Sequence, residues 1–231
     1  MYRALAFITA LILLLCAGSM VWGEEQQTGI IVTGSADVQG QPDVAYVTLG
    51  VNTQDKIAAT AAQANAAATD KVITAIIHVG IPKTDIRTSS YSIGTMTDYR
   101  SNPPVITGYQ ASNEVQVTIH DLAKIGPVID AAVAAGANVA NGVNFGIEND
   151  TELRQRALVL AIKSAQAKAQ TMAEVLGVKL GPVLSATEAG GVTPPRPVMY
   201  GMAKAEAAPT PIMPGQLTVN ASVTVVYIII R

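Results

Sequence analysis

Three glycines constrain the fold of this chain more than any other feature. Gly80, Gly136 and Gly177 each follow a stretch in which apolar residues recur every three or four positions, and each precedes a stretch rich in alternating or β-branched residues. The first spacing is typical of one face of an α-helix, and glycine readily takes the left-handed conformation that ends a helix. The sequence therefore predicts three helices, each ended by a glycine and followed by a strand.

These helices are predicted over residues 55–79, 121–135 and 149–176. Asn149 is expected to begin the longest helix, with its side chain accepting a hydrogen bond from the Glu152 amide in a variant of the capping box. The apolar stripe predicted for that helix consists of Leu153, Ala157, Leu160, Ala161, Ala165, Met172 and Leu176.

Alternating apolar and polar residues predict the strands. The clearest is "VITGYQASNEVQVTIHD" at 105–121, where Val115, Val117 and Ile119 share one face. Two strands are expected around a turn at residues 40–42, and others over residues 84–99, 138–148, 178–189 and 216–230. The predicted fold class is α+β: a mostly antiparallel sheet of about seven strands with three helices packed on one face.

Residues 1–23 have the layout of a secretory signal peptide. Arg3 precedes an apolar stretch over 4–15, and small residues follow before Glu24. Cleavage after Gly23 is expected; the alternative is an uncleaved anchor over 4–22, since about twenty residues can span a bilayer. In both cases the α+β domain at 24–231 is exported, to the periplasm, the extracellular space or the outer face of the cytoplasmic membrane.

Composition excludes several classes of function. Charged residues make up 14% of the 231 residues and the formal net charge is −2, with no basic run, so nucleic acid is not an expected partner. Cys16, the only cysteine, lies inside the export segment. The mature chain would then have no disulfide and no thiolate nucleophile.

No catalytic, cofactor-binding or metal-binding residue is predicted. His78 and His120 are not at metal-ligand spacing. A metal site would have to join His120 to Asp121 or to distant carboxylates, and a solvated histidine is the favoured interpretation. The acidic cluster Glu148, Asp150 and Glu152 is explained by the helix dipole, because negative charge is favourable at a helix N-terminus.

A proline- and methionine-rich loop at 191–214 is the candidate contact with another subunit or a lipid surface. Methionine adapts to irregular surfaces, and proline lowers the entropy lost on ordering. A flexible linker is the alternative. The candidate contact residues are Val198, Met199, Tyr200, Met202, Ile212 and Met213.

Five stretches resemble the SIMPL-domain (DUF541) family, of the 26-kDa periplasmic immunogen type: "GQPDVAYVTLGV", "ITGYQASNEVQVTIHDL", "VIDAAVAAGANVANGVNFGI", "AKAQTMAEVLGVKLGPVLS" and "MPGQLTVNASVTVVY". They occur in family order over about residues 29–228. The stretch "TGSADV" departs from the family, which usually has a second glycine there. The resemblance implies an exported protein, tied to stress or surface exposure, with no agreed enzymatic activity and plausible self-assembly.

The sequence thus favours a non-enzymatic envelope protein that self-associates into a homo-oligomer, with possible peripheral contact with a membrane. The expected contacts are the loop and a sheet face rich in Thr, Ser, Asn and Gln. The alternative is a ligand-binding or sensor module that uses a groove beside the sheet. An enzyme is the weakest hypothesis, because no nucleophile motif or phosphate-binding loop is present.

Overall fold

A computed structural model describes residues 29–188 and 212–230. In this part of the chain it has seven strands and three helices, which confirms the α+β class. The elements are β1 (Gly29–Gly40), β2 (Val44–Asp55), α2 (Ala58–His78), β3 (Ile86–Asp98), β4 (Val105–Ile119), α3 (Ile125–Ala134), β5 (Val139–Gly146), α4 (Thr151–Leu176), β6 (Lys179–Glu188) and β7 (Leu217–Ile230), with single turns η1 (Lys83–Asp85) and η2 (Leu122–Lys124).

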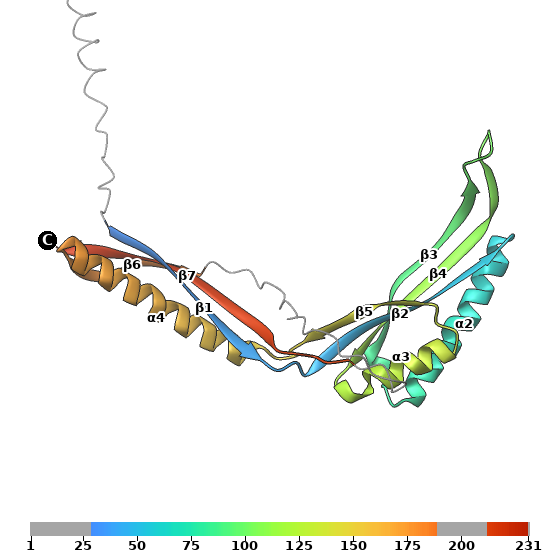
Figure 1. The fold of residues 1–231 in the computed structure, drawn as a ribbon, viewed down its shortest axis with the longest axis horizontal. Coiled ribbons are helices and arrows are strands. Elements are labelled where there is room, and N and C mark those ends of the chain that lie inside the picture. Colours follow the sequence, from blue (N-terminus) through green and yellow to red (C-terminus); the bar gives the residue numbers. More distant parts are fainter. Residues whose placement is uncertain (1–28, 189–211, 231) are drawn as a thin grey trace, which may run out of the picture.

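The seven strands form two antiparallel sheets and not the single sheet expected. The order is β1-β7-β6 in a three-stranded sheet and β3-β4-β2-β5 in a four-stranded one. Figure 1 shows an elongated, bent molecule with one sheet in each lobe. In the smaller lobe α4 lies along the three-stranded sheet, and in the larger lobe α2 and α3 pack on the four-stranded sheet.

The first two strands lie on either side of residues 41–43, as expected, but they do not pair with each other as a hairpin. Two-residue hairpin turns need residues with positive φ. Gly40 is not among the positive-φ glycines, and residues 41–43 form no helix or strand. The chain therefore passes from one sheet to the other: β1 pairs with β7, while β2 pairs with β4 and β5.

The core of the larger lobe lies between its sheet and its two helices. Val47, Val117 and Ile76 are almost completely buried there. Asn65 of α2 is also buried, and its side-chain amide donates to the carbonyl oxygens of Val51 at 2.7 Å and Ala111 at 3.0 Å. These bonds tie the helix to two neighbouring strands, because each replaces water on a buried carbonyl.

The core of the smaller lobe depends on small residues. The buried positions of α4 are Ala157, Ala161, Ala165, Ala169 and Ala173. The predicted stripe was therefore wrong in part: Leu160, Met172 and Leu176 are exposed by 46%, 42% and 60%. The reason is close approach, since a Cβ on Gly34 of β1 would lie 2.1 Å from the Ala161 carbonyl oxygen. Larger side chains cannot fit in this interface, and they point outward.

The three glycines end their helices as expected. Their φ values are +93° at Gly80, +115° at Gly136 and +67° at Gly177, all in the region that favours glycine. The start of α4 differs from the prediction, because the Asn149 side chain accepts from the Thr151 amide at 3.2 Å and not from Glu152. None of the helices in residues 29–188 or 212–230 is long and apolar enough to cross a membrane.

Replacing Gly34 with alanine tests the close contact between β1 and α4. The added methyl group would overlap the backbone of α4, so we expect a loss of about 3 kcal/mol in the free energy of unfolding. The control is Gly94→Ala in β3, where no atom lies within 4 Å of an added Cβ, and its effect should stay below about 0.5 kcal/mol. Urea unfolding followed by circular dichroism measures both. Equal stabilities of the two variants would contradict the contact.

Candidate functional site

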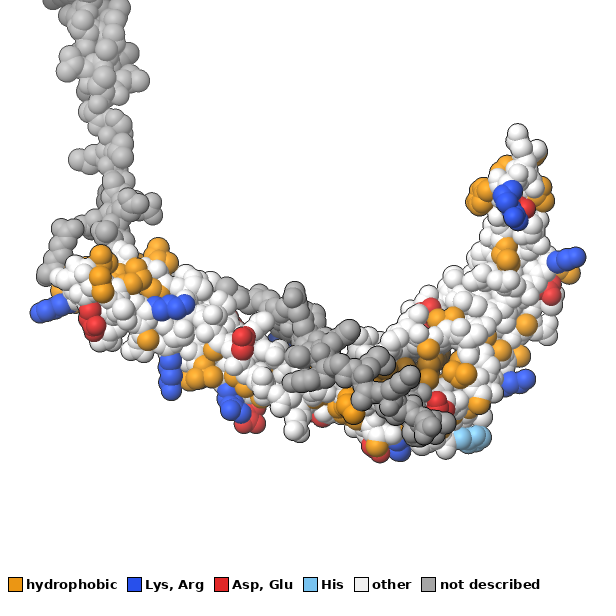
Figure 2. Space-filling view, in the orientation of Figure 1, with side chains coloured by type: hydrophobic (Ala, Val, Ile, Leu, Met, Phe, Trp, Pro, Cys, Tyr) orange, Lys and Arg blue, Asp and Glu red, His pale blue; other side chains and the backbone are white. Residues whose placement is uncertain are grey.

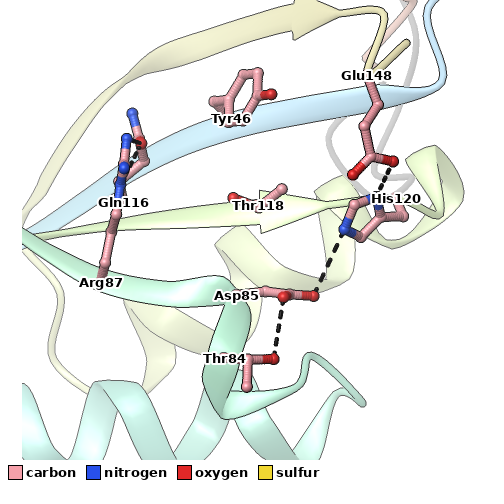
Figure 3. A pocket seen from close by; sticks show the side chains of 8 residues that line it. All are labelled: Tyr46, Thr84, Asp85, Arg87, Gln116, Thr118, His120 and Glu148. Atoms are coloured by element: carbon pink, nitrogen blue, oxygen red, sulfur yellow. Dashed lines mark hydrogen bonds and ion pairs between the residues drawn. The ribbon is translucent and has the colours of Figure 1, made fainter.

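A polar hollow lies on the four-stranded sheet, on the face opposite α2 and α3 (Figure 3). Its volume is about 550 Å³. The alternation of β2 and β4 positions it, because the apolar residues of both strands point into the core and the polar ones point out. The hollow is lined by Tyr46, Thr84, Asp85, Arg87, Gln116, Thr118, His120 and Glu148.

One end of the hollow holds His120 between two carboxylates. Its Nε2 lies 3.7 Å from Asp85 Oδ2, and its Nδ1 lies 3.3 Å from Glu148 Oε2. Asp85 comes from η1, Glu148 from the connection between β5 and α4, and His120 directly follows β4. The histidine thus joins three segments, and its side chain is 47% exposed. The expectation of a solvated histidine did not foresee these partners.

This end is not arranged as a metal site. Asp85 and Glu148 face different nitrogens of the His120 ring, so the three side chains do not converge on one point. Within residues 29–188 and 212–230 there is no group of three or more His, Cys, Asp or Glu side chains that could hold a metal ion.

The other end of the hollow carries Arg87. Its Nε donates to Gln116 Oε1 at 2.9 Å, and its Nη2 donates to the same oxygen. Arg87 and Gln116 are direct cross-strand partners on β3 and β4. Because an amide oxygen is neutral, these bonds orient the guanidinium group without cancelling its charge. The ion pairs among the described residues do not include Arg87.

The acidic end is also fixed to the passage between the two lobes. Asp43 lies between β1 and β2, and its Oδ1 accepts a hydrogen bond from the Glu148 amide at 2.7 Å. The Asp43 amide donates in turn to the Gly146 carbonyl oxygen at 3.1 Å. These two bonds position Glu148 beside His120.

A second candidate surface is the arm, which we define as residues 90–111 at the joined ends of β3 and β4. Figure 1 shows it projecting beyond α2. Several large apolar side chains of the arm have large exposed fractions. Figure 2 shows apolar side chains gathered toward the tip of the arm. The values are 55% for Tyr91, 45% for Ile93, 80% for Tyr99, 52% for Val105 and 55% for Ile106.

The arm also carries an unguarded strand edge. Natural sheets protect their edges with lysine, proline or bulges. The edge of β1 is covered by Lys168 of α4, whose Nζ donates to the Thr33 carbonyl oxygen at 2.7 Å, and β6 has Pro182 within a register shift. In β3 the shifts lie at residues 88–90 and 96–97. The segment between them has neither charge nor proline over 90–96.

The loop residues predicted as contacts are only partly described. Val198, Met199, Tyr200 and Met202 lie outside the described residues. Ile212 packs against the core of the larger lobe, and Met213 is 86% exposed. The two described members of the set therefore face different surroundings, and the role of the loop stays a prediction. Sequence reasoning missed the arm, since its exposure depends on how far the helices extend over the sheet.

The fold and the hollow define an antiparallel α+β protein with two lobes and a polar surface site on one of them. The chain belongs to the SIMPL family, described as "Protein of unknown function (DUF541)", whose model matches residues 30–227 and so spans both lobes. It is 33% identical over 212 residues to the 26 kDa periplasmic immunogenic protein of Brucella melitensis, covering 87% of this chain and 85% of the relative. It is 32% identical over 180 residues to the uncharacterized protein YggE of Escherichia coli K12, covering 78% and 73%.

These comparisons confirm the resemblance drawn from the sequence. They also confirm the predicted export, since two of the relatives are named as periplasmic. Cleavage after Gly23 remains a prediction.

Removing the Asp43 side chain tests the connection that positions Glu148. Asp43→Ala deletes the acceptor of the Glu148 amide, so we expect faster hydrogen exchange at that amide and a loss of about 1 kcal/mol in the free energy of unfolding. Asp43→Asn keeps an acceptor oxygen and serves as the control. Unchanged exchange in Asp43→Ala would show that the bond does not hold Glu148.

Proposed function

We propose that this chain is a non-enzymatic envelope protein that associates with further copies of itself through the arm. The observation that carries the proposal is the edge of β3, where an unguarded strand coincides with exposed Tyr91 and Ile93. An open edge presents unpaired backbone N–H and C=O groups, and another strand satisfies them.

The exposed side chains add a hydrophobic contribution to such pairing. Apolar area removed from water contributes about 25 cal/mol per Å², and the arm offers five large apolar side chains that are each at least 45% exposed. The low charge of the chain also reduces repulsion between copies. Both terms favour a contact between identical surfaces, which is the usual route to closed oligomers.

The polar sheet face of the smaller lobe offers a second contact of the kind predicted from the sequence. On β1 and β7 the outward residues pair as Thr33 with Thr224 and Ser35 with Ser222. The two threonine hydroxyls lie 3.1 Å apart. Uncharged hydroxyls can join an interface without the desolvation of full charges.

A non-enzymatic role is supported by the surroundings of His120. Both of its nitrogens face carboxylates, so neither is hydrogen-bonded to a hydroxyl that could serve as a nucleophile. The arrangement suits a structural or binding role better than acyl transfer.

The test of self-association is light scattering on the exported protein beside two variants. Ile93→Lys places a charge on the arm, and we expect it to shift an oligomeric parent to monomers, because a lysine would have to be buried in the contact. Val175→Lys is the matched control, since Val175 is also exposed, by 82%, but lies on α4 of the other lobe, away from both proposed contacts. The control should keep the parent's mass.

A monomeric parent would overturn the proposal. Dissociation by Val175→Lys alone would place the contact on α4 of the smaller lobe and remove the role of the arm. A third variant, with residues 194–211 replaced by a Gly/Ser linker of equal length, tests the loop separately. It keeps Ile212, which the core of the larger lobe requires.

A further inference from the structure

We infer that the polar hollow is a binding site for a short peptide of about three residues with free termini. The peptide's ammonium group would lie at Glu148, on the Nδ1 side of His120, and its carboxylate at Arg87. This inference concerns a different surface from the arm and does not rest on self-association. The sequence left open a ligand-binding function as the alternative, and a short peptide is the class of ligand inferred for it.

The two ends of the hollow have opposite charge. Arg87 and Gln116 lie at one end, and His120 with its two carboxylates lies at the other (Figure 3). Gln116 and His120 are four residues apart along the same strand direction, so the ends are separated by about 13 Å at roughly 3.3 Å per residue. An extended peptide of three residues spans roughly 10 Å between its terminal charges. The hydrogen-bond distances between the peptide's terminal charges and the side chains at the two ends cover the difference.

This charge pattern selects against simpler ligands. An anion would be attracted by Arg87 at one end but repelled by two carboxylates at the other. A cation would be attracted by the carboxylates but repelled by Arg87. A ligand with both charges, separated by the length of the hollow, has a favourable partner at each end. Arg87 is suited to a carboxylate because its planar guanidinium can donate two parallel hydrogen bonds.

The middle of the hollow provides groups for the peptide backbone. Tyr46 and Thr118 are direct cross-strand partners on β2 and β4, and Figure 3 shows both between the charged ends. Their hydroxyls can donate to peptide carbonyl groups and accept from peptide amides. The Tyr46 ring adds an apolar surface for a small side chain.

Hydrogen bonds within the protein hold the residues of the acidic end in place. Asp43 fixes the Glu148 backbone, and Thr84 Oγ1 donates to Asp85 Oδ1 at 3.2 Å. His120 holds the two carboxylates on either side of its ring. Positions fixed in advance reduce the ordering cost when a ligand binds.

The experiment uses trialanine as the probe and the exported protein as purified. Saturation-transfer difference NMR measures the dissociation constant, because it observes the ligand and tolerates a large protein. The comparison peptides are N-acetyl-trialanine, which lacks the ammonium group, and trialanine amide, which lacks the carboxylate. We expect each to bind at least about tenfold more weakly than trialanine, which corresponds to the loss of one charged contact.

Two variants assign the ends. Arg87→Gln should remove the preference for trialanine over its amide, and Glu148→Gln should reduce the preference over the acetylated peptide. The matched controls are Arg100→Gln at the tip of the arm and Glu152→Gln in the first turn of α4, both outside the hollow. They should bind all three peptides as the parent does, and circular dichroism confirms that every variant is folded.

Absence of trialanine binding would overturn the inference. So would equal binding of the blocked peptides, or unchanged preferences in folded Arg87→Gln and Glu148→Gln. Peptide binding that is kept in Ile93→Lys would show that the hollow acts independently of the arm.

Discussion

The pairing of β1 with β7 is the contact on which the rest of the structure depends. These strands lie near opposite ends of the described chain and pair over twelve residues, from Gly29 with Ile228 to Gly40 with Leu217. The whole larger lobe is inserted between them. Because the entropy of closing a loop grows only slowly with its length, this long-range pairing is compatible with a stable lobe. It also makes β7 the central strand, so that α4 and β6 have a surface on which to pack.

Local patterns in the sequence predicted most elements but not their partners. The helix-ending glycines and the alternation of β4 depend on neighbouring residues, and both were confirmed. The partner of β1 depends on residues near the other end of the described chain, and the turn residues at 40–42 say nothing about that partner. The stripe of α4 failed for a related reason: hydrophobicity favoured Leu160 and Met172, whereas the space beside Gly34 admits only alanine.

For the polar hollow too, the local sequence pattern predicted the individual residues' faces but not which residues meet. With Val117 and Ile119 predicted on one face of β4, alternation leaves Thr118 and His120 on the other face, and this was correct. Register then decided which of them meet: Tyr46 opposes Thr118, and the segments after β5 and before β3 bring Glu148 and Asp85 to His120. Nothing in a single sequence reports that register. The two proposed surfaces consequently differ in kind, since the arm offers backbone edges and apolar side chains, while the hollow offers fixed charges.

The alanines of α4 recur at every fourth residue from Ala157 to Ala173. Such a row is unchanged by a translation of four residues, about 6 Å along the helix, so the row alone does not fix where the helix sits on the sheet. Gly34 removes this degeneracy, because it receives the helix backbone between Ala161 and Ala165. The bond from Lys168 to Thr33 marks the same alignment from the edge of the sheet. Gly34 and Lys168 together fix the position along the sheet of a helix whose own repeat would allow several positions.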